Sequence, residues 1–401
     1  MANVSSSNGL ENRPKLRFPG FDEPYKQCRI GDIYAERSQR GDSNMELLSV
    51  TMNDGVMPRS EIEGKDNSSE DKSNYKIVHK GDMVYNSMRM WQGANGISPC
   101  DGIVSPAYTV LMPKQEINNG YFAALFKNSN LINEFRKNSQ GMTSDTWNLK
   151  YPQIETIKVQ IPSISEQNKV SEIFRILDER IAAQSQLIDT LKKYKRGVIQ
   201  ALLSPKDCKL QNVKWTTARV GDIGIFIKGA PLSKSDISSE GIPFILYGEL
   251  YTTYNEVITK VIRKTKANVD DLYYSRKGDV IIPTSGETPE EISTASCVMV
   301  PDVILAGDLN IYRCTQIDGQ IMSYILNHIV NDKIARIAQG KSIVHVQATE
   351  ISKIEVTYPD QLSQKKIVAI LAAISDRIDQ SNKELELLQK QHKSLLQKLF
   401  I

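Results

Sequence analysis

The sequence repeats itself once, and this internal duplication constrains the fold more than any other feature. Lys80-Gly81-Asp82 recurs 197 positions later as Lys277-Gly278-Asp279. Glu179-Arg180-Ile181 recurs at the same distance as Asp376-Arg377-Ile378. The register holds through residues 161–202, which is too long a stretch for chance. A chain of 401 residues therefore has two domains of ordinary size plus additional helix, in preference to one large core.

Each copy ends in the pattern of a long amphipathic helix. Apolar residues follow steps of three and four positions through residues 170–202 and again through residues 367–399. The polar residues that interrupt these two apolar seams are Gln184, Lys195, Ser381 and His392. A helix from about Ser165 to Leu203 would be ~58 Å long at ~1.5 Å per residue, which exceeds a small domain.

The ends of both helices are specified as well. Ser163 and its twin Asp360 are suitable N-caps, and Glu166 completes a capping box in the first copy. Ser204-Pro205 ends the first helix, because proline cannot continue the helical hydrogen bonds.

Apolar stripes of this length must be buried against something. The nearest partner for each is the other copy, and we expect an antiparallel coiled coil that holds two domains apart. The alternative is that each helix folds back on its own domain. The seam residues expected in the helix pair, and on surfaces shared with partner subunits, are Leu177, Ile181, Ile188, Leu191, Val198, Ile374, Ile378, Leu385, Leu388 and Leu395.

Upstream of each helix, the pattern is that of a mixed α/β domain. Short β-rich runs at residues 76–78 and 280–282 adjoin the Lys-Gly-Asp turns. Helical stretches follow at residues 121–138 and 320–338, each before a Gln-Gly pair. The halves are otherwise dissimilar. Two copies that share a framework and differ in their loops are typical of domains that recognise different targets.

The composition limits the possible classes of protein. The 50 Lys and Arg residues and 47 Asp and Glu residues leave a net charge of +3, so a basic surface for nucleic acid has to be local. Five scattered cysteines without a Cys-x-x-Cys pair predict reduced thiols. No apolar run approaches the ~20 residues of a membrane span. We expect a soluble, cytoplasmic protein without a membrane segment.

Sequence motifs for catalysis are missing. There is no Asn/Asp-Pro-Pro-aromatic tetrapeptide and no Gly-x-Gly-x-x-Gly cofactor loop. Gln339-Gly340-Lys341-Ser342 resembles the end of a P-loop, but Ala335 replaces its first glycine and a predicted helix precedes it. The four histidines have no metal-ligand spacing. We therefore predict no catalytic residue, no metal ligand and no cofactor in this chain.

Two other functions stay open on the residues alone. A nuclease-like site can be assembled from Asp54 and Glu63-Gly64-Lys65, so a self-contained DNA-modifying or DNA-cleaving enzyme is one alternative. The near-neutral charge and the long helices suggest another, an architectural coiled-coil scaffold that binds DNA without sequence preference.

The order of motifs carries a resemblance to a known family. Residues 14–21, Pro-Lys-Leu-Arg-Phe-Pro-Gly-Phe, stand near the amino terminus, and Lys-Gly-Asp adjoins a strand in both halves. The Gln-Gly pairs lead to Leu149-Lys150-Tyr151-Pro152 in one half and to His345-Val346-Gln347 in the other, before Ile-Pro and the long helix. Over nearly its whole length the chain resembles the specificity (S) subunit of type I restriction-modification enzymes.

This resemblance implies two inverted target-recognition domains in a pseudo-twofold arrangement, joined by two long antiparallel coiled-coil helices. Each domain would read one half of a split DNA site, and the helices would set a spacing of roughly one duplex turn, 34 to 36 Å. The expected divisions are a polar tail (1–14), the first recognition domain (15–162), a central helix (163–204), a linker (205–213), the second recognition domain (214–359) and a distal helix (360–401).

The resemblance also implies partners and their chemistry. Two methyltransferase subunits would dock against the helices and methylate adenine with S-adenosylmethionine. Restriction/translocase subunits would cleave with ATP and Mg. This chain would supply the DNA specificity of the complex, in a bacterial or archaeal cytoplasm.

Direct readout of bases needs Arg, Lys, Asn or Gln on loops, with hydroxyl and basic groups for the phosphates. In the first half we expect DNA contacts from Arg89, Trp91, Gln92, Asn95, Thr143 and Lys150. In the second half the candidates are Tyr247, Glu249, Thr284, Ser285, Lys341, Ser342, His345 and Gln347. Ordinary core packing is the alternative for Trp91.

Overall fold

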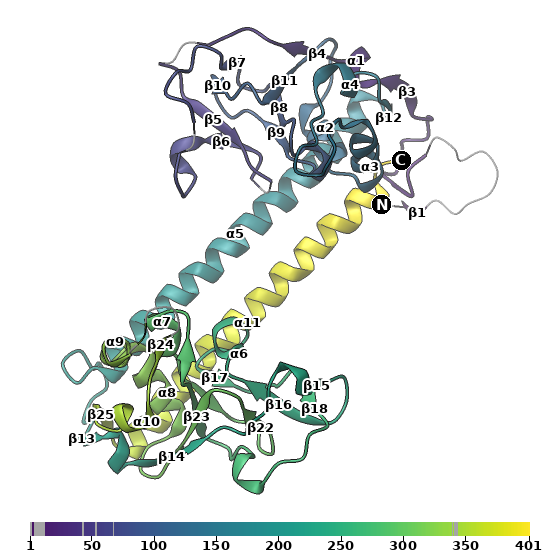
Figure 1. Cartoon of the computed structure of the whole chain (residues 1–401). Coiled ribbons are helices and arrows are strands. Elements are labelled where there is room, and N and C mark those ends of the chain that lie inside the picture. Colours follow the sequence, from purple (N-terminus) through teal and green to yellow (C-terminus); the bar gives the residue numbers. More distant parts are fainter. Residues whose placement is uncertain are drawn as a thin grey trace. The chain divides into compact units, whose positions relative to one another are not determined.

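The computed structural model describes residues 2–3, 13–41, 44–52, 54–66, 68–338, 340 and 344–401. The chain forms two compact units (Figure 1). The first unit comprises Met1–Gln186 and Lys383–Ile401, and the second comprises Leu187–Asn382. Each unit therefore contains one globular copy of the repeat together with a segment of both long helices.

Two four-stranded sheets form the centre of the first unit. In spatial order, one sheet contains β6 (Val56–Pro58), β5 (Leu47–Val50), β10 (Gly102–Val104) and β7 (Lys76–Val78). The other contains β4 (Tyr34–Arg37), β11 (Tyr108–Pro113), β8 (Met83–Asn86) and β9 (Asn95–Ile97). Two short strand pairs are β1 (Ala2–Asn3) with β2 (Leu16–Arg17) and β3 (Lys26–Arg29) with β12 (Lys158–Ile161).

The helical stretch predicted at residues 121–138 is divided into two helices. The helical elements of the first unit's globular part are α1 (Ile30–Ile33), η1 (Arg59–Glu61), η2 (Met90–Gln92), α2 (Asn119–Leu125), α3 (Ser129–Asn138) and α4 (Tyr151–Ile154). The division falls at Asn128, whose side chain caps α3 by accepting from the backbone N–H groups of Asn130 and Leu131. Asparagine favours such caps over helix interiors, which explains the break.

The second unit repeats the two-sheet plan with more strands. One sheet contains, in order, β14 (Gly224–Lys228), β23 (Leu309–Cys314), β19 (Asp279–Pro283), β21 (Ser296–Val298) and β17 (Val257–Ile258). The other contains β15 (Ile237–Ser238), β18 (Lys264–Thr265), β16 (Ile242–Leu246) and β22 (Ile304–Ala306). The short pairs are β13 (Trp215–Arg219) with β25 (Glu355–Pro359) and β20 (Ser285–Gly286) with β24 (Val344–His345).

Among the described residues, the second globular part has more short helical elements than the first. They are η3 (Val220–Asp222), η4 (Lys234–Asp236), α6 (Glu249–Thr252), η5 (Asp271–Tyr273), α7 (Pro289–Ile292), α8 (Gly319–His328), α9 (Asn331–Ile337) and α10 (Ala348–Ile351). The stretch predicted at residues 320–338 is again two helices, α8 and α9. The mixed α/β class predicted from the sequence is confirmed in both units.

The Lys-Gly-Asp turns show why the duplication is visible in the sequence. Gly81 and Gly278 adopt φ values of 91° and 95°, a region that favours glycine. In both turns the aspartate accepts from the backbone N–H three residues earlier, from His79 to Asp82 and from Arg276 to Asp279. The repeated residues are therefore those that the turn geometry requires.

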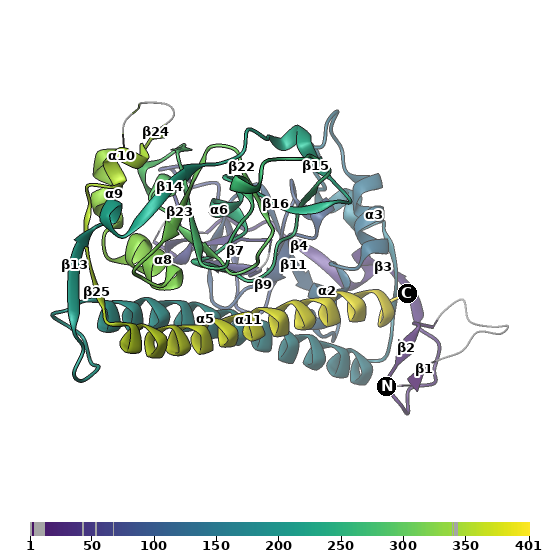
Figure 2. The same ribbon diagram turned by 90° about the horizontal axis from the view of Figure 1, so that it is seen from below.

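Both long helices predicted from the apolar periodicity are confirmed. Helix α5 spans Ile164–Leu203 and α11 spans Gln361–Lys398. In the first unit they run antiparallel, because Asp178 of α5 contacts His392 of α11 and Gln184, further along α5, contacts the earlier Glu384 (Figure 2). In the second unit, the end of α5 and the start of α11 share one apolar core.

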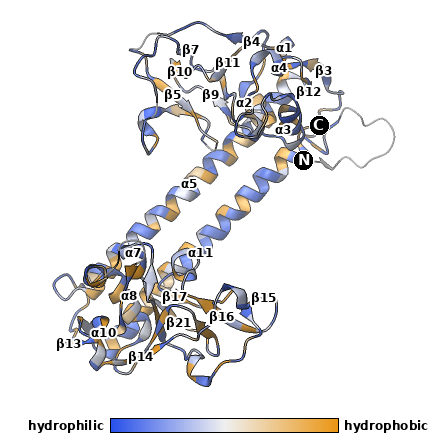
Figure 3. Ribbon diagram, in the orientation of Figure 1, coloured by the Kyte–Doolittle hydropathy of each residue, from blue (hydrophilic) through white to orange (hydrophobic). Residues whose placement is uncertain are grey.

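The seam residues predicted for the helix pair are all buried or partly buried. Ile188, Ile378 and Leu388 are buried. The partly buried members of the set are Leu177, Ile181, Leu191, Val198, Ile374, Leu385 and Leu395. Apolar residues therefore form an inner stripe along each helix, and hydrophilic residues alternate with them (Figure 3).

One of the two predicted helix caps is confirmed and the other prediction is wrong in part. Asp360 caps α11, accepting from the backbone N–H groups of Leu362 and Ser363. Its bonds from the Lys214 and Ser363 backbone lower the pKa of Asp360 to about 2. Glu166 does not serve the predicted capping box, because its carboxylate accepts both guanidinium bonds of Arg17, at 2.9 and 2.8 Å.

The core of the first unit is completed by the far end of α11. The rings of Tyr121 and Phe400 lie 5.3 Å apart, and Phe174 of α5 stacks on Phe400 at 5.8 Å. Leu399 and Phe400 are both buried in this cluster. The side chain of Asn128 also donates to the carbonyl of Leu396 at 2.7 Å. Residues from opposite ends of the sequence therefore share one hydrophobic core.

Candidate nucleic-acid interface

The two loops predicted as readers in the first unit are brought together. The backbone N–H of Leu149 donates to the carbonyl of Ser87 at 2.8 Å, which joins the loop after α3 to the loop after β8. The rings of Trp91 and Trp147 meet edge to face, with centroids 5.2 Å apart. Segments chosen separately from the sequence thus form one surface.

The loop after α3 is a small hairpin, residues 140–148. Gln140 and Asn148 exchange backbone hydrogen bonds of 3.0 and 2.8 Å. Across the tip, Thr146 donates its backbone N–H to the carbonyl of Thr143 at 3.0 Å. Gly141 has a φ of 144°, and a Cβ there would lie 2.6 Å from the Thr146 carbonyl oxygen. The hairpin therefore has a defined shape that requires glycine at its base.

The predicted contacts of the first unit differ in their exposure. Arg89, Gln92, Thr143 and Lys150 have exposed side chains and are available to a ligand. Trp91 is half-buried, and its indole Nε1 donates to the carbonyl of Met88 at 3.1 Å. Trp91 therefore packs against the fold and is also partly exposed, so its position is compatible with both alternatives that the sequence left open, core packing and DNA contact.

The prediction for Asn95 does not fit the structure. Asn95 lies in β9 with 0% of its surface exposed, and its carboxamide donates to the carbonyl of Gly93. A side chain inside the core cannot reach a base edge, so Asn95 is a structural residue of the loop. Residue type indicates the capacity for hydrogen bonding and says nothing about burial.

Sequence reasoning missed three residues of this surface. Trp147 and Met142 lie within the segment that follows α3, but neither is among its predicted contacts. Arg136, in the last turn of α3, has its guanidinium carbon 5.8 Å from the centre of the Trp91 ring. A cation over an aromatic face is a recognisable contact, but residues 91 and 136 are too distant in sequence for a local pattern to show it.

The second unit has the same junction between its two loops. The N–H of Val346 donates to the carbonyl of Thr284 at 3.0 Å, which is the Leu149–Ser87 bond shifted by 197 positions at both ends. Ser285 pairs with His345 between β20 and β24. His345 and Gln347 are exposed, Thr284 and Tyr247 are partly exposed, and Lys341 and Ser342 lie outside the described residues.

Two predicted readers of the second unit are buried. Glu249 is 3% exposed, and its carboxylate accepts from the backbone of Leu246 and from Arg263 Nε, each at 3.0 Å. Ser285 is 6% exposed, and its hydroxyl donates to Asp308. Both predictions as base contacts are at odds with this burial, because these polar groups are already bonded inside the fold.

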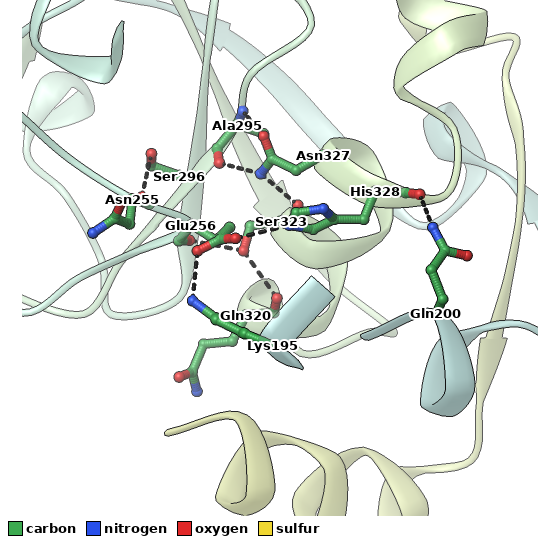
Figure 4. A network of polar contacts seen from close by, with 10 residues as sticks. All are labelled: Lys195, Gln200, Asn255, Glu256, Ala295, Ser296, Gln320, Ser323, Asn327 and His328. Atoms are coloured by element: carbon green, nitrogen blue, oxygen red, sulfur yellow. Dashed lines mark hydrogen bonds and ion pairs between the residues drawn. The ribbon is translucent and has the colours of Figure 1, made fainter. Parts of the chain in front are cut away.

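A polar network attaches α5 to the globular part of the second unit (Figure 4). Glu256 accepts from Lys195 Nζ at 2.8 Å and contacts His328 Nε2 at 2.7 Å. Gln200, one turn beyond Lys195, donates to the carbonyl of His328 at 2.6 Å. Burial raises the pKa of Glu256, but the bond to His328 and the charge of Lys195 outweigh it and lower this pKa to about 2. The polar interruption at Lys195 in the apolar seam is therefore an anchoring point.

The residues of the alternative nuclease site lie on the surface. Asp54, Glu63 and Lys65 are all exposed. The neighbouring Arg59 holds this loop by donating to the carbonyls of Gly64 and Lys65. Throughout the part of the chain that the structure describes, no group of three His, Cys, Asp or Glu side chains is placed to hold a metal ion.

The described helices also include none that is long and apolar enough to cross a membrane.

Both copies of the repeat match known proteins. Residues 23–193 and 212–390 each match the family described as type I restriction modification DNA specificity domain. The chain is 20% identical over 347 residues to the type I restriction enzyme MjaVIII specificity subunit of Methanocaldococcus jannaschii, covering 80% of this chain and 78% of the relative. It is 26% identical over 187 residues to the HindI specificity subunit of Haemophilus influenzae, covering 44% and 40%.

A solved structure has the same fold. The S subunit of a type I restriction-modification system from M. genitalium matches with a TM-score of 0.61 at 15% identity, over 97% of this chain and 99% of that chain.

The chain belongs to the family of type I restriction-modification DNA specificity proteins, because the family match covers most of both repeats. It is a specificity subunit, a non-catalytic component that carries the DNA specificity of its complex. The cofactors of such a complex reside on its methyltransferase and restriction subunits.

Proposed function

We propose that each unit reads one half of a bipartite DNA site and that adenine within the site is methylated by partner subunits. The observation that supports this most is the loop junction shared by the two units. The same backbone bond, Leu149 to Ser87 and Val346 to Thr284, holds both reading surfaces. The side chains around it differ, with Arg89 and Trp91 in one unit and His345 and Gln347 in the other. One scaffold thus presents two unlike sets of base-reading groups.

The partners follow from what this chain lacks in its sequence. Methyl transfer needs S-adenosylmethionine, and cleavage driven by a motor needs ATP and Mg, so we assign these to two methyltransferase subunits and to restriction/translocase subunits. The exposed faces of α5 and α11 are the proposed docking surface for the methyltransferase subunits. Large apolar side chains remain exposed there, at Ile176, Leu187, Tyr194 and Leu387.

The test is to express the chain with its neighbouring methyltransferase subunit in a host without adenine methylation. Sequencing that detects methylated adenine should show one split motif, with two specified halves around an unspecified spacer. An unsplit motif, or no methylation with both subunits assembled, would contradict the proposal. Replacing residues 15–162 with the corresponding domain of a relative should change one half of the motif and leave the other half unchanged.

A further inference from the structure

The hairpin at residues 140–148 carries the most exposed large apolar side chain in the described part of the chain. Met142 is 100% exposed, whereas the next most exposed such residues, Ile262 and Leu362, are both at 66%. A side chain without intramolecular burial contributes nothing to the hydrophobic stability of the fold. Its position at the tip therefore calls for a contact outside this chain.

Hydrogen bonds within the hairpin constrain the backbone of the tip that carries Met142. The side chain of Thr146 donates to the carbonyl of Thr143 at 3.0 Å and accepts from its backbone N–H at 3.2 Å, in addition to the backbone bond across the tip. Below the tip, Trp147 packs on Trp91, which η2 and the Met88 carbonyl hold in position. A tip fixed in advance loses little conformational entropy when it binds.

The charges around the hairpin favour a polyanion over an apolar protein surface. The cations with exposed side chains are Arg89, Arg136, Lys137 and Lys150. The acidic groups nearby are Asp145 on the hairpin and Glu134, which is paired with Lys137 at 2.7 Å. Basic groups bind phosphates and position a protein on the duplex, while an apolar side chain between them contacts bases.

We propose that this hairpin enters a groove of the first half-site and that Met142 packs against base edges there, as an apolar specificity residue. The proposal rests on the proposed function, since it assigns one residue of the reading surface. The flexible, polarisable thioether suits contact with a thymine methyl group or an aromatic base edge. By the register of the Gln-Gly pairs, the sequence of the second repeat has Lys341 at this position, so the two half-sites would be read by different chemistry.

The experiment compares Met142→Ala and Met142→Leu in the assembled complex with its methyltransferase subunits. Anisotropy at fixed salt measures the affinity for a duplex with the methylated motif and for a scrambled duplex of equal composition. Met142→Ala should lose about tenfold in affinity for the motif, the order of one base contact, and lose little for the scrambled duplex. Met142→Leu should retain most of the affinity.

The matched control is Met112→Ala, because Met112 is another exposed methionine of the first unit, 37% exposed, at the opposite end of β11 from the reading loop. It should leave both affinities unchanged. Equal affinity of Met142→Ala and the native complex for the motif would overturn the proposal. Failure of Met142→Ala to assemble would overturn it too, since the tip would then belong to a protein interface. If the native complex itself binds both duplexes alike, the proposed function fails instead.

Discussion

In the first unit a buried ion pair fixes the start of α5, where Arg17 donates to both carboxylate oxygens of Glu166. At the matching place in the second unit the twin of Glu166 is Ser363, whose hydroxyl donates to the N-cap residue of α11. In the second unit a largely buried ion pair holds α5 near its end instead, where Lys195 pairs with Glu256. Each unit therefore attaches to a different part of the same helix by charge.

Hydrogen bonds from neutral side chains, in contrast, occur at the same positions in both units. Gln167 accepts from the backbone of Asn118 at 3.1 Å, and its twin Gln364 accepts from Asp318 at 2.8 Å. Both glutamines also donate to the carbonyl of the proline five residues earlier. Hydrogen bonds from neutral side chains to the backbone are thus repeated in both units, whereas the ion pairs that attach α5 to a globular part, Arg17–Glu166 and Lys195–Glu256, are each specific to one unit. Four predictions separate these two kinds of contact.

The largest effect is expected for Arg17→Met. This change leaves the Glu166 carboxylate, 1% exposed, buried without its cation, and should destabilise the first unit by about 3 to 5 kcal/mol. Urea unfolding followed by tryptophan fluorescence measures it, because Trp91 and Trp147 lie in the first unit and Trp215 can be replaced by Phe. The double variant Arg17→Met with Glu166→Leu should recover most of the loss. An unchanged midpoint for Arg17→Met would show that the pair does not hold the helix.

A smaller effect is expected for Glu256→Gln, which should destabilise the second unit by about 2 to 4 kcal/mol. The change removes the negative charge beside Lys195, whose side chain is only 12% exposed, but it leaves a neutral hydrogen-bond acceptor there. Hydrogen exchange should rise in the second unit and stay constant in the first. Lys195→Met alone should be similarly damaging, since it removes the main cation beside Glu256.

The same carboxylate predicts an acid dependence of stability. Its pKa is lowered from 4.5 to about 2 in the folded chain, so its contribution is present above pH ~4.5 and is lost as the pH falls towards 2. That contribution should be on the order of 3 kcal/mol. Urea midpoints of the second unit between pH 5 and pH 2.5 should fall less steeply in Glu256→Gln than in the native chain, and parallel curves would contradict the assignment.

The smallest effect is expected for the matched pair Gln167→Leu and Gln364→Leu. Each loses two neutral side-chain bonds to the backbone, so each should cost about 1 to 3 kcal/mol in its own unit. Hydrogen exchange of the backbone amides in the strands of each unit measures the two losses of stability separately. Similar losses would support a shared framework, and a loss confined to one unit would break the comparison.

The long helices could be predicted from sequence because a buried stripe leaves a local period in the residues. The polar residues that interrupt the apolar stripes could be located in the same way, but their partners could not be predicted. Glu256 is 61 positions from Lys195, and Arg17 is 149 positions from Glu166. The local sequence predicts a capping box for Glu166, which is a contact between near neighbours in the chain. The tertiary fold instead provides a charged partner, Arg17, whose bonds to the carboxylate are stronger.

For the proposed reading surface, the sequence indicates loops that the structure brings together, but not the burial of the individual side chains. The segments around Arg89 and Lys150 do meet, since turns and strands positioned them. Asn95 and Glu249 were assigned to the surface by residue type, although both are inside the fold. The sequence alone does not single out Met142, because apolar residues are expected in cores, and only the structure shows its full exposure.

The burial of Phe400 beside Tyr121 has a consequence for the order in which the protein is made. The second unit, Leu187–Asn382, is one continuous stretch and can fold once the ribosome has released it. The first unit is translated earlier but needs Lys383–Ile401 to close its core. The half that is synthesised first is therefore the half that finishes folding last, and until then its open core is the surface that a chaperone would recognise.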